Sequence, residues 1–252
     1  MADVHLWHLP IVFLAGLIGE GYGTVIGSGG ILIQFILSTL GLPLRQVVAS
    51  DIAGAMGANF GIISASGVSP WKNKILLIVL TIPILIGDIA GAFFLVNASA
   101  AVLRGIIVVA LVVVVAVMFI HKRVLPIHLE SVRVTPIQYP VLAILLLALG
   151  WYGNAVGVGS GTFSKLLLSG TLRISVADSI ALGQIIALPG SIIFLVVTAW
   201  NGLLVWPYIA ALWLGSFIGS RAVTRHIRKI PDSWLRALLT IVTMLYLVYL
   251  LA

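Results

Sequence analysis

The chain has 252 residues, of which 61% are hydrophobic and 8% are charged, and its mean hydropathy is +1.22. A water-soluble domain carries about a quarter charged residues, so this composition excludes a soluble globular protein and indicates a chain that lies mostly in lipid. The formal net charge of +7 is typical of membrane proteins, whose basic residues gather at the cytoplasmic ends of helices, and it does not indicate nucleic acid.

Long apolar segments follow one another along the chain. A spanning helix needs about 20 largely apolar residues, and such segments cover residues 9–40, 46–66, 75–96, 101–120, 137–169, 176–199, 203–221 and 234–252. The first and the fifth are longer than one crossing, and each contains a cluster of glycines, the weakest ordinary helix formers. We therefore predict two broken helices, whose second limbs begin near Gly30 and Thr162.

The chain also divides into two related halves. The matches, first half against second, are residues 26–30 (Ile-Gly-Ser-Gly-Gly) against 158–162 (Val-Gly-Ser-Gly-Thr), 49–51 (Ala-Ser-Asp) against 177–179 (Ala-Asp-Ser), Gly87/Gly91 against Gly215/Gly219, and 103–104 (Leu-Arg) against 235–236 (Leu-Arg). We interpret the Gly-x-x-x-Gly pairs as close helix packing. The common order indicates an internal duplication, with an N-terminal repeat over 1–121, a basic cytoplasmic linker over 122–135 and a C-terminal repeat over 136–252, all in one integral membrane domain.

The distribution of basic residues favours inverted halves. If each glycine-rich segment crosses the membrane once, the basic residues of the loops divide eight against five between the two faces, which is a poor bias. If each segment instead enters and returns on one side, one face holds Arg45 and Arg104 while the other holds the remaining basic residues of the loops, as the positive-inside rule requires.

We therefore predict an all-α integral membrane protein of two inverted repeats, each with a broken, re-entrant glycine-rich helical hairpin and three spanning helices, a recurrent transporter design. The basic loops at 121–135 and 221–236 are then cytoplasmic, and both termini lie outside the cell membrane.

The two glycine-rich breaks are the expected binding site for a small oxyanion. Helix N-termini carry unpaired N–H groups and a positive dipole end, and glycine lets a ligand approach the backbone closely. Non-helical backbone at membrane depth must face protein or a cavity. The alternative is that these glycines only allow close helix packing. The predicted substrate-binding residues are Gly27, Ser28, Gly29, Gly30, Gly159, Ser160, Gly161, Thr162 and Lys165.

Ionisable residues inside apolar segments are costly and indicate function. Lys165 is expected either to attract an anion or to pair with a buried acid. Glu20 and Asp88 are the candidates for proton coupling, whereas Asp51 and Asp178 are interpreted as helix caps. Polar residues expected either to bond the substrate or to join neighbouring helices are Gln34, Asn59, Asn154 and Gln184.

Several chemistries are absent from the sequence. It has no cysteine, which excludes disulfides and thiolate metal sites, and it contains neither a G-x-x-x-x-G-K-[ST] loop nor an H-E-x-x-H motif. Residues 159–161 (Gly-Ser-Gly) do not make a G-x-S-x-G nucleophile elbow. We therefore expect no enzyme, no cofactor and no metal.

At these residues the sequence resembles the sulfite exporter TauE/SafE family of bacterial and archaeal membrane permeases, over essentially the whole chain. The positions that carry the resemblance are Gly27, Gly29, Gly30, Gly159, Gly161, Ala49-Ser50, Ala177, Ser179, Leu103-Arg104 and Leu235-Arg236. The resemblance implies transport, usually export, of sulfite, sulfoacetate or a related organosulfonate, coupled to an ion gradient. Ser28 and Ser160 interrupt the usual glycine run of the family, which leaves the exact anion open.

The leading hypothesis is therefore a proton-coupled secondary transporter of a small sulfur-containing anion. A passive anion channel would use the same breaks as a filter, and a non-transporting assembly or sensor subunit is the third possibility. The expected partners are the anion and the lipid bilayer. The sequence carries no signal for the oligomeric state.

Overall fold

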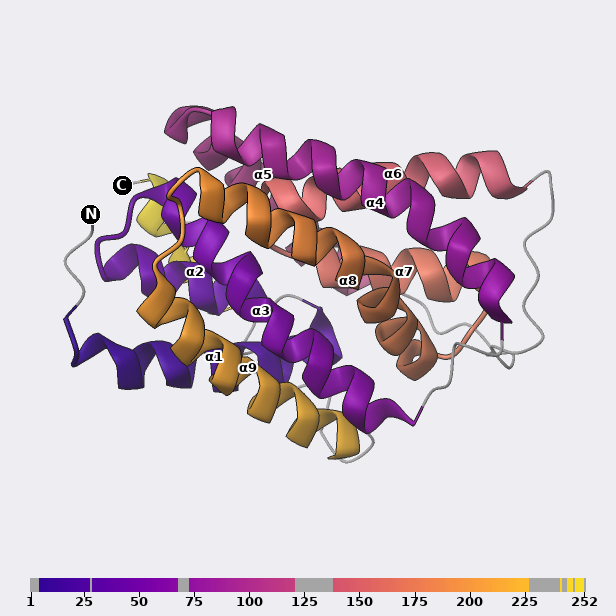
Figure 1. The fold of residues 1–252 in the computed structure, drawn as a ribbon, viewed down its shortest axis with the longest axis horizontal. Coiled ribbons are helices and arrows are strands. Elements are labelled where there is room, and N and C mark those ends of the chain that lie inside the picture. The colour runs from indigo at the N-terminus through magenta and orange to yellow at the C-terminus, as the bar shows by residue number, and fades with distance from the viewer. Residues whose placement is uncertain are drawn as a thin grey trace.

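The computed structural model describes residues 5–27, 29–67, 73–120, 138–226, 241, 244–246 and 248–251. The helices are α1 (His8–Ile26), α2 (Gly29–Thr39), α3 (Leu44–Ser66), α4 (Lys74–Asn97), α5 (Ala100–Ile120), α6 (Gln138–Ala155), α7 (Ser160–Leu172), α8 (Val176–Trp200) and α9 (Trp206–His226). Figure 1 shows α4 and α6 together on one side of the molecule, α1 and α9 together on the other, and α3 and α8 between them.

The composition and the helices agree on a membrane protein. Within the described residues, four helical segments are long and apolar enough to cross a membrane: His8–Ile26, Leu44–Ser66, Lys74–Asn97 and Ala177–Trp200. The expectation of an all-α membrane protein is confirmed. α1 is long enough to cross by itself, although the re-entrant arrangement does not require it to do so.

Both glycine-rich segments are broken, as predicted. α1 stops at Gly27, which has a left-handed conformation with φ of 92°. α6 and α7 are separated by Gly157 and Gly159, with φ of 80° and 75°. A side chain is strained in this region of backbone space, so glycine at these positions allows the chain to leave the helix. The second limbs begin at Gly29 and Ser160, slightly earlier than expected.

Each broken segment is a helical hairpin. In the first, a β-carbon built on Gly19 would lie 3.1 Å from Ile33 Cγ1 and one on Gly23 would lie 2.6 Å from Gly29 Cα, so α2 runs back along α1. In the second hairpin, residues of α7 share a buried cluster with residues near the start of α6: Leu142, Leu146, Leu168 and Leu172.

Small residues allow the outer helix pairs to pack closely. A β-carbon on Gly91 of α4 would lie 3.0 Å from the Ala155 amide nitrogen of α6, and one on Gly16 of α1 would lie 3.1 Å from the Ser216 amide nitrogen of α9. At Gly215 of α9, a β-carbon would lie 2.8 Å from a backbone nitrogen of α1. In lipid, helices associate through this kind of close contact because burying apolar surface gains little. The packing interpretation of the Gly-x-x-x-Gly pairs is confirmed.

The two halves exchange equivalent contacts. α1, the first helix of the first half, packs on α9 of the second half, and α6, the first helix of the second half, packs on α4 of the first. A duplicated fold with a two-fold relation between its halves would make this exchange. The orientation of that relation to the bilayer, and with it the inverted topology and the domain boundaries, stays a prediction.

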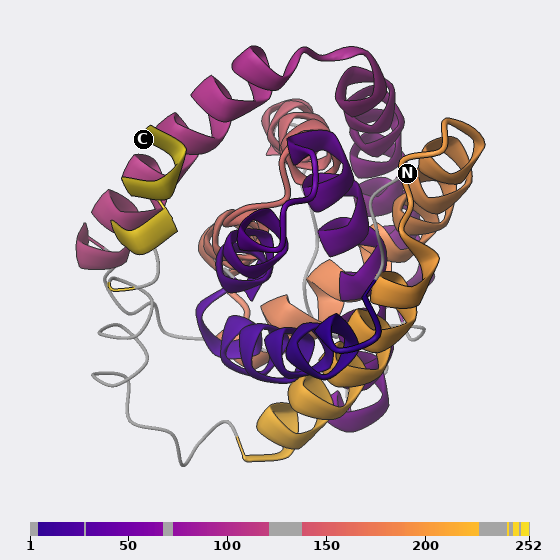
Figure 2. The same ribbon diagram turned by 90° about the vertical axis from the view of Figure 1, so that its left-hand side faces the viewer.

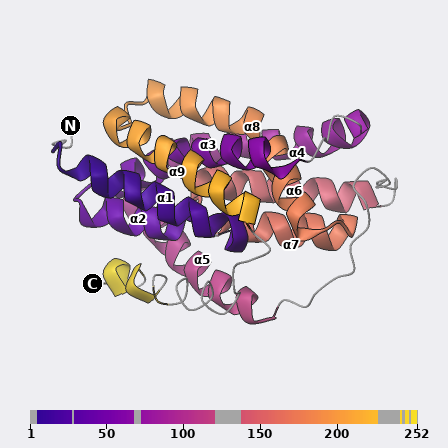
Figure 3. The same cartoon turned by 90° about the horizontal axis from the view of Figure 1, so that it is seen from below.

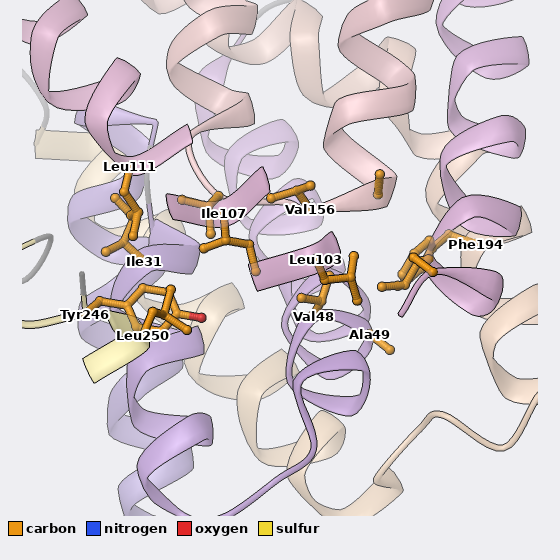
Figure 4. Close-up of a cluster of buried hydrophobic side chains, with 14 of the residues drawn as sticks. Ile31, Val48, Ala49, Leu103, Ile107, Leu111, Val156, Phe194, Tyr246 and Leu250 are labelled. Atoms are coloured by element: carbon orange, nitrogen blue, oxygen red, sulfur yellow. The ribbon is translucent and has the colours of Figure 1, made fainter. Parts of the chain in front are cut away.

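α5 closes the molecule beside the hairpins. Figures 2 and 3 show α5 close to the yellow C-terminal residues, away from α8 and α9. Figure 4 shows the apolar cluster that results, in which Leu103 and Ile107 of α5 meet Val48 of α3, all fully buried. Tyr246 and Ile31 belong to the same cluster. This packing fixes α2 and α3 next to the glycine breaks, mainly through van der Waals contact.

The predictions about which loops and termini face the cytoplasm concern mostly residues that the structure does not describe. The linker at 122–135 and most of the second basic loop lie there, whereas residues 221–226 form the end of α9. The cytoplasmic placement of these loops and the outward position of both termini therefore stay predictions.

The helix contacts predict a difference between two glycine-to-alanine changes. Gly91→Ala forces a methyl group into the backbone of α6, and we expect a loss of stability of roughly 1–3 kcal/mol, the usual cost of overpacking. Gly105→Ala on α5 meets no atom within 4 Å and should leave stability unchanged or raise it by up to about 1 kcal/mol. Thermal unfolding in detergent measures both, and equal melting temperatures for the two variants would contradict the proposed contact.

Candidate functional site

The two glycine breaks lie against each other at the centre of the molecule. The Thr162 backbone N–H donates to the Gly27 carbonyl oxygen at 3.0 Å, and the Thr162 hydroxyl donates to the Ile26 carbonyl oxygen at 2.8 Å. A β-carbon built on Gly27 would lie 2.7 Å from Thr162 Cα, and one on Gly161 would lie 2.8 Å from the Gly27 carbonyl oxygen. The structure thus brings together the two motifs that the sequence analysis paired.

Lys165 joins the same two breaks from the side of α7. Its ammonium group donates to the Thr24 carbonyl oxygen at 2.7 Å and to the Gly23 carbonyl oxygen at 3.4 Å, and the residue is 8% exposed. These carbonyls belong to the last turn of α1, where the helix dipole is negative and a cation is favourable. Glu20 is close enough to interact electrostatically with this ammonium group.

A cavity of about 170 Å³ opens beside the breaks. This volume suits a small anion with a few waters, because one water takes up about 30 Å³ in the liquid. The predicted site residues that line the cavity are Glu20, Gly27, Gly29, Gly30, Asn59, Asp88, Asn154, Ser160, Gly161, Lys165 and Gln184. Gly159, Thr162 and Gln34 do not belong to the lining, and Ser28 lies outside the described residues.

Two carboxyl groups lie next to the start of α2. A β-carbon on Gly29 would lie 2.8 Å from Glu20 Oε1, and one on Gly30 would lie 2.6 Å from Asp51 Oδ2. The positive end of the α2 dipole therefore faces carboxyl groups of the protein itself. An anion at this helix start would meet negative charge whenever these groups are ionised.

Asp51 was wrongly interpreted as a cap. α3 begins at Leu44, well before Asp51, and the Asp51 carboxyl group is buried and accepts from Gln34 Nε2 at 2.8 Å. Asp178 does lie in the first turn of α8, but the capping side chain is that of Ser175, which accepts from the Asp178 N–H at 3.0 Å. An acid within an apolar segment is costly, and this sequence feature could have identified Asp51 as a cavity residue.

Gln34 has a joining role. Its Nε2 also donates to the Val156 carbonyl oxygen at 2.8 Å, and its Oε1 accepts from the Tyr246 hydroxyl at 3.3 Å. One side chain thus links α2 to Asp51, to the second break and to the C-terminal residues. This arrangement favours the helix-joining reading of Gln34 over direct contact with a substrate.

The amides of α7 are largely satisfied within the protein. The Ser160 N–H donates to the Gly157 carbonyl oxygen at 3.2 Å, and the Phe163 N–H donates to the Gly159 carbonyl oxygen at 3.2 Å. The Thr162 N–H is shared between the carbonyls of Gly27 and Gly159. The expectation that this helix start offers several unpaired amides is therefore wrong for these three groups.

Asp88 is the third buried acid of the cavity. Its Oδ2 has no hydrogen-bond partner among the described residues, and its backbone carbonyl accepts from Asn154 Nδ2 at 3.2 Å. Nearby on the wall, Asn59 Nδ2 lies 3.5 Å from Ser191 Oγ.

The cavity is rich in acid. Three carboxyl groups line it, from Glu20, Asp51 and Asp88, and Lys165 is the only basic side chain that does so in the described part of the chain. No group of three or more His, Cys, Asp or Glu side chains in the residues described could hold a metal ion. An anion can share this space only where the negative charge of the carboxyl groups is offset, because like charges in a low-dielectric site repel strongly.

In a comparison with protein-family models, the model described as "Sulfite exporter TauE/SafE" matches residues 11–250. No curated protein and no solved structure matches the chain significantly.

The contact between the breaks predicts unequal effects of two alanine substitutions. Gly27 and Gly41 both have positive φ, at 92° and 85°, so alanine costs each roughly 1–2 kcal/mol of backbone strain. A side chain at residue 41 meets nothing within 4 Å, whereas one at residue 27 meets the backbone of Thr162. We expect Gly27→Ala to lower the melting temperature clearly more than Gly41→Ala does. Matching losses would mean that the breaks do not touch.

Proposed function

Because the chain belongs to the sulfite exporter TauE/SafE family, whose members are membrane permeases and not enzymes, we propose that it is a secondary transporter that exports a small sulfur-containing anion. Sulfite, sulfoacetate or another organosulfonate is the proposed substrate, and the cell membrane the proposed location. The observation that carries the site assignment is the meeting of two broken helices beside a cavity of suitable size.

The proposed anion position is the α7 side of the cavity. Lys165 supplies a positive charge there, and Ser164 supplies a hydroxyl group to the cavity lining. The Ser160 hydroxyl also lines the cavity, but it donates to the Gly157 carbonyl oxygen at 2.8 Å and would have to rotate to reach an anion. A hydrogen bond to a charged group contributes about 1.5–3 kcal/mol, which is enough for Lys165 to dominate the affinity. The α2 side is less suitable, because Glu20 and Asp51 already face that helix start.

Proton coupling follows from the excess of carboxyl groups. When Glu20 is ionised, its negative charge offsets that of Lys165; when Glu20 carries a proton, the lysine charge is available to the anion. Anion and proton would then occupy the cavity together and move in the same direction, so export would follow the outward concentration gradient of the anion itself, whereas an inward proton gradient would drive uptake. Asp88, which also lines the cavity, is the second proposed proton carrier.

Replacement of Lys165 tests the binding site. We expect Lys165→Met to weaken sulfite binding by about tenfold to a hundredfold, the equivalent of one charged hydrogen bond, and Lys165→Arg to keep a larger part of it. Sulfite-dependent thermal stabilisation of the purified protein measures the affinity. Unchanged affinity in Lys165→Met, in a variant that remains folded, would remove the proposed anion position.

Replacement of Glu20 tests the coupling and separates a transporter from a channel. In proteoliposomes, we expect the unmodified protein to accumulate sulfite against its gradient when the outside is acidic, and sulfite affinity to rise as pH falls by up to about tenfold per pH unit for one bound proton. Glu20→Gln should still exchange sulfite but lose proton-driven accumulation. A passive channel would show sulfite flux without accumulation in either protein.

A further inference from the structure

The Asp88 carboxyl group occupies a notch in α8. A β-carbon built on Gly190 would overlap Asp88 Oδ2, so the oxygen takes the place where a side chain of residue 190 would begin. Asp88 is 5% exposed, and this oxygen has no hydrogen-bond partner among the described residues. A buried carboxylate with an unsatisfied oxygen is costly unless a partner compensates it. A ligand bound next to this oxygen would remove that cost.

The notch coincides with the proline of α8. Pro189 lacks an N–H group, so it cannot donate to the Ile185 carbonyl oxygen as a helical residue normally does. Gly190, the next residue, removes the side chain that would otherwise keep Asp88 away.

Neutral oxygen atoms share this part of the cavity wall with Asp88. Ser191 follows the notch on α8, and the Asn59 Nδ2 of α3 donates to Ser191 Oγ at 3.5 Å. Both residues line the cavity together with Asp88. One carboxylate among hydroxyl and amide oxygens is the ligand type that hard cations prefer.

The charge that balances Asp88 does not come from the described part of the protein. Lys165, the only basic side chain that lines the cavity in the described part of the chain, donates to carbonyl oxygens of α1, and Asp88 Oδ2 has no hydrogen-bond partner in the residues described. A single carboxylate matches a single positive charge. The absence of a cluster of three or more His, Cys, Asp or Glu side chains in the same residues argues against a divalent ion.

We propose that Asp88, together with Asn59 and Ser191, forms a binding site for a small alkali cation, of which Na⁺ is the physiological example. Its further role, which rests on the proposed function, is to let this cation, in place of a proton at Asp88, accompany the anion and offset the charge of the carboxylate.

The test uses the full-length protein in detergent at one fixed pH. Choline chloride is replaced by NaCl, LiCl or KCl at constant ionic strength while thermal unfolding is followed. We expect a saturable rise of several degrees in melting temperature with Na⁺ or Li⁺, and little with K⁺. Equal melting temperatures in all four salts would overturn the proposal without any variant, and would leave a proton as the partner of Asp88.

Variants locate the site. Asp88→Asn should abolish the Na⁺ response, and Gly190→Ala should weaken it by displacing the carboxylate. Asp178→Asn, which removes a carboxyl group from the first turn of α8 outside the cavity wall, should keep the full response. A Na⁺ response that persists in Asp88→Asn would overturn the assignment.

Adding a second ligand tests the cation site independently of the proposed transport function. Potassium sulfite is added to the same samples, and the folded Asp88→Asn protein should still be stabilised by it through Lys165. Loss of the Na⁺ response with a retained sulfite response supports two separate subsites. A Na⁺ response without any sulfite response would support the cation site and refute the anion site.

Discussion

The hydrogen bond from the Thr162 N–H to the Gly27 carbonyl oxygen marks the contact on which the centre of this molecule depends. A helix that stops inside a membrane leaves polar backbone groups that lipid cannot satisfy. Here each break supplies part of what the other lacks: α7 gives an amide, a hydroxyl and the Lys165 ammonium group, and α1 gives its last carbonyls. Neither break would be stable in lipid without the other.

This mutual satisfaction has a consequence for ligand binding. Amides and carbonyls that bond each other are no longer available to a substrate, so the side chains around the breaks determine what the cavity accepts. Those side chains are divided unequally. The carboxyl groups of Glu20, Asp51 and Asp88 all come from the first half of the chain, and the ammonium group of Lys165 comes from the second. The charged groups of the cavity are therefore divided between the two parts of the chain, and the proposed anion site and the proposed cation site draw on different parts.

The surrounding helices position the breaks through small residues. α1 packs on α9 and α4 packs on α6 with glycine at the points of contact, so backbones approach each other closely enough to enclose a small cavity. The absence of a side chain also matters for Asp88, because its carboxyl group fits against α8 only when residue 190 is glycine. Close packing and site geometry therefore have one physical origin, the absence of a β-carbon at chosen positions.

The sequence by itself determined the membrane class, the helical segments and the two breaks, because hydropathy and glycine content act locally and need no partner. It also singled out Lys165, Glu20 and Asp88, since an ionisable group in an apolar segment is costly wherever it points. Only the tertiary structure decided that Thr162 bonds Gly27, that Gln34 joins α2 to Val156 and that Asp51 lines the cavity instead of capping a helix. These pairings join residues from different helices, and hydropathy and glycine spacing along one segment do not specify which distant groups will satisfy one another.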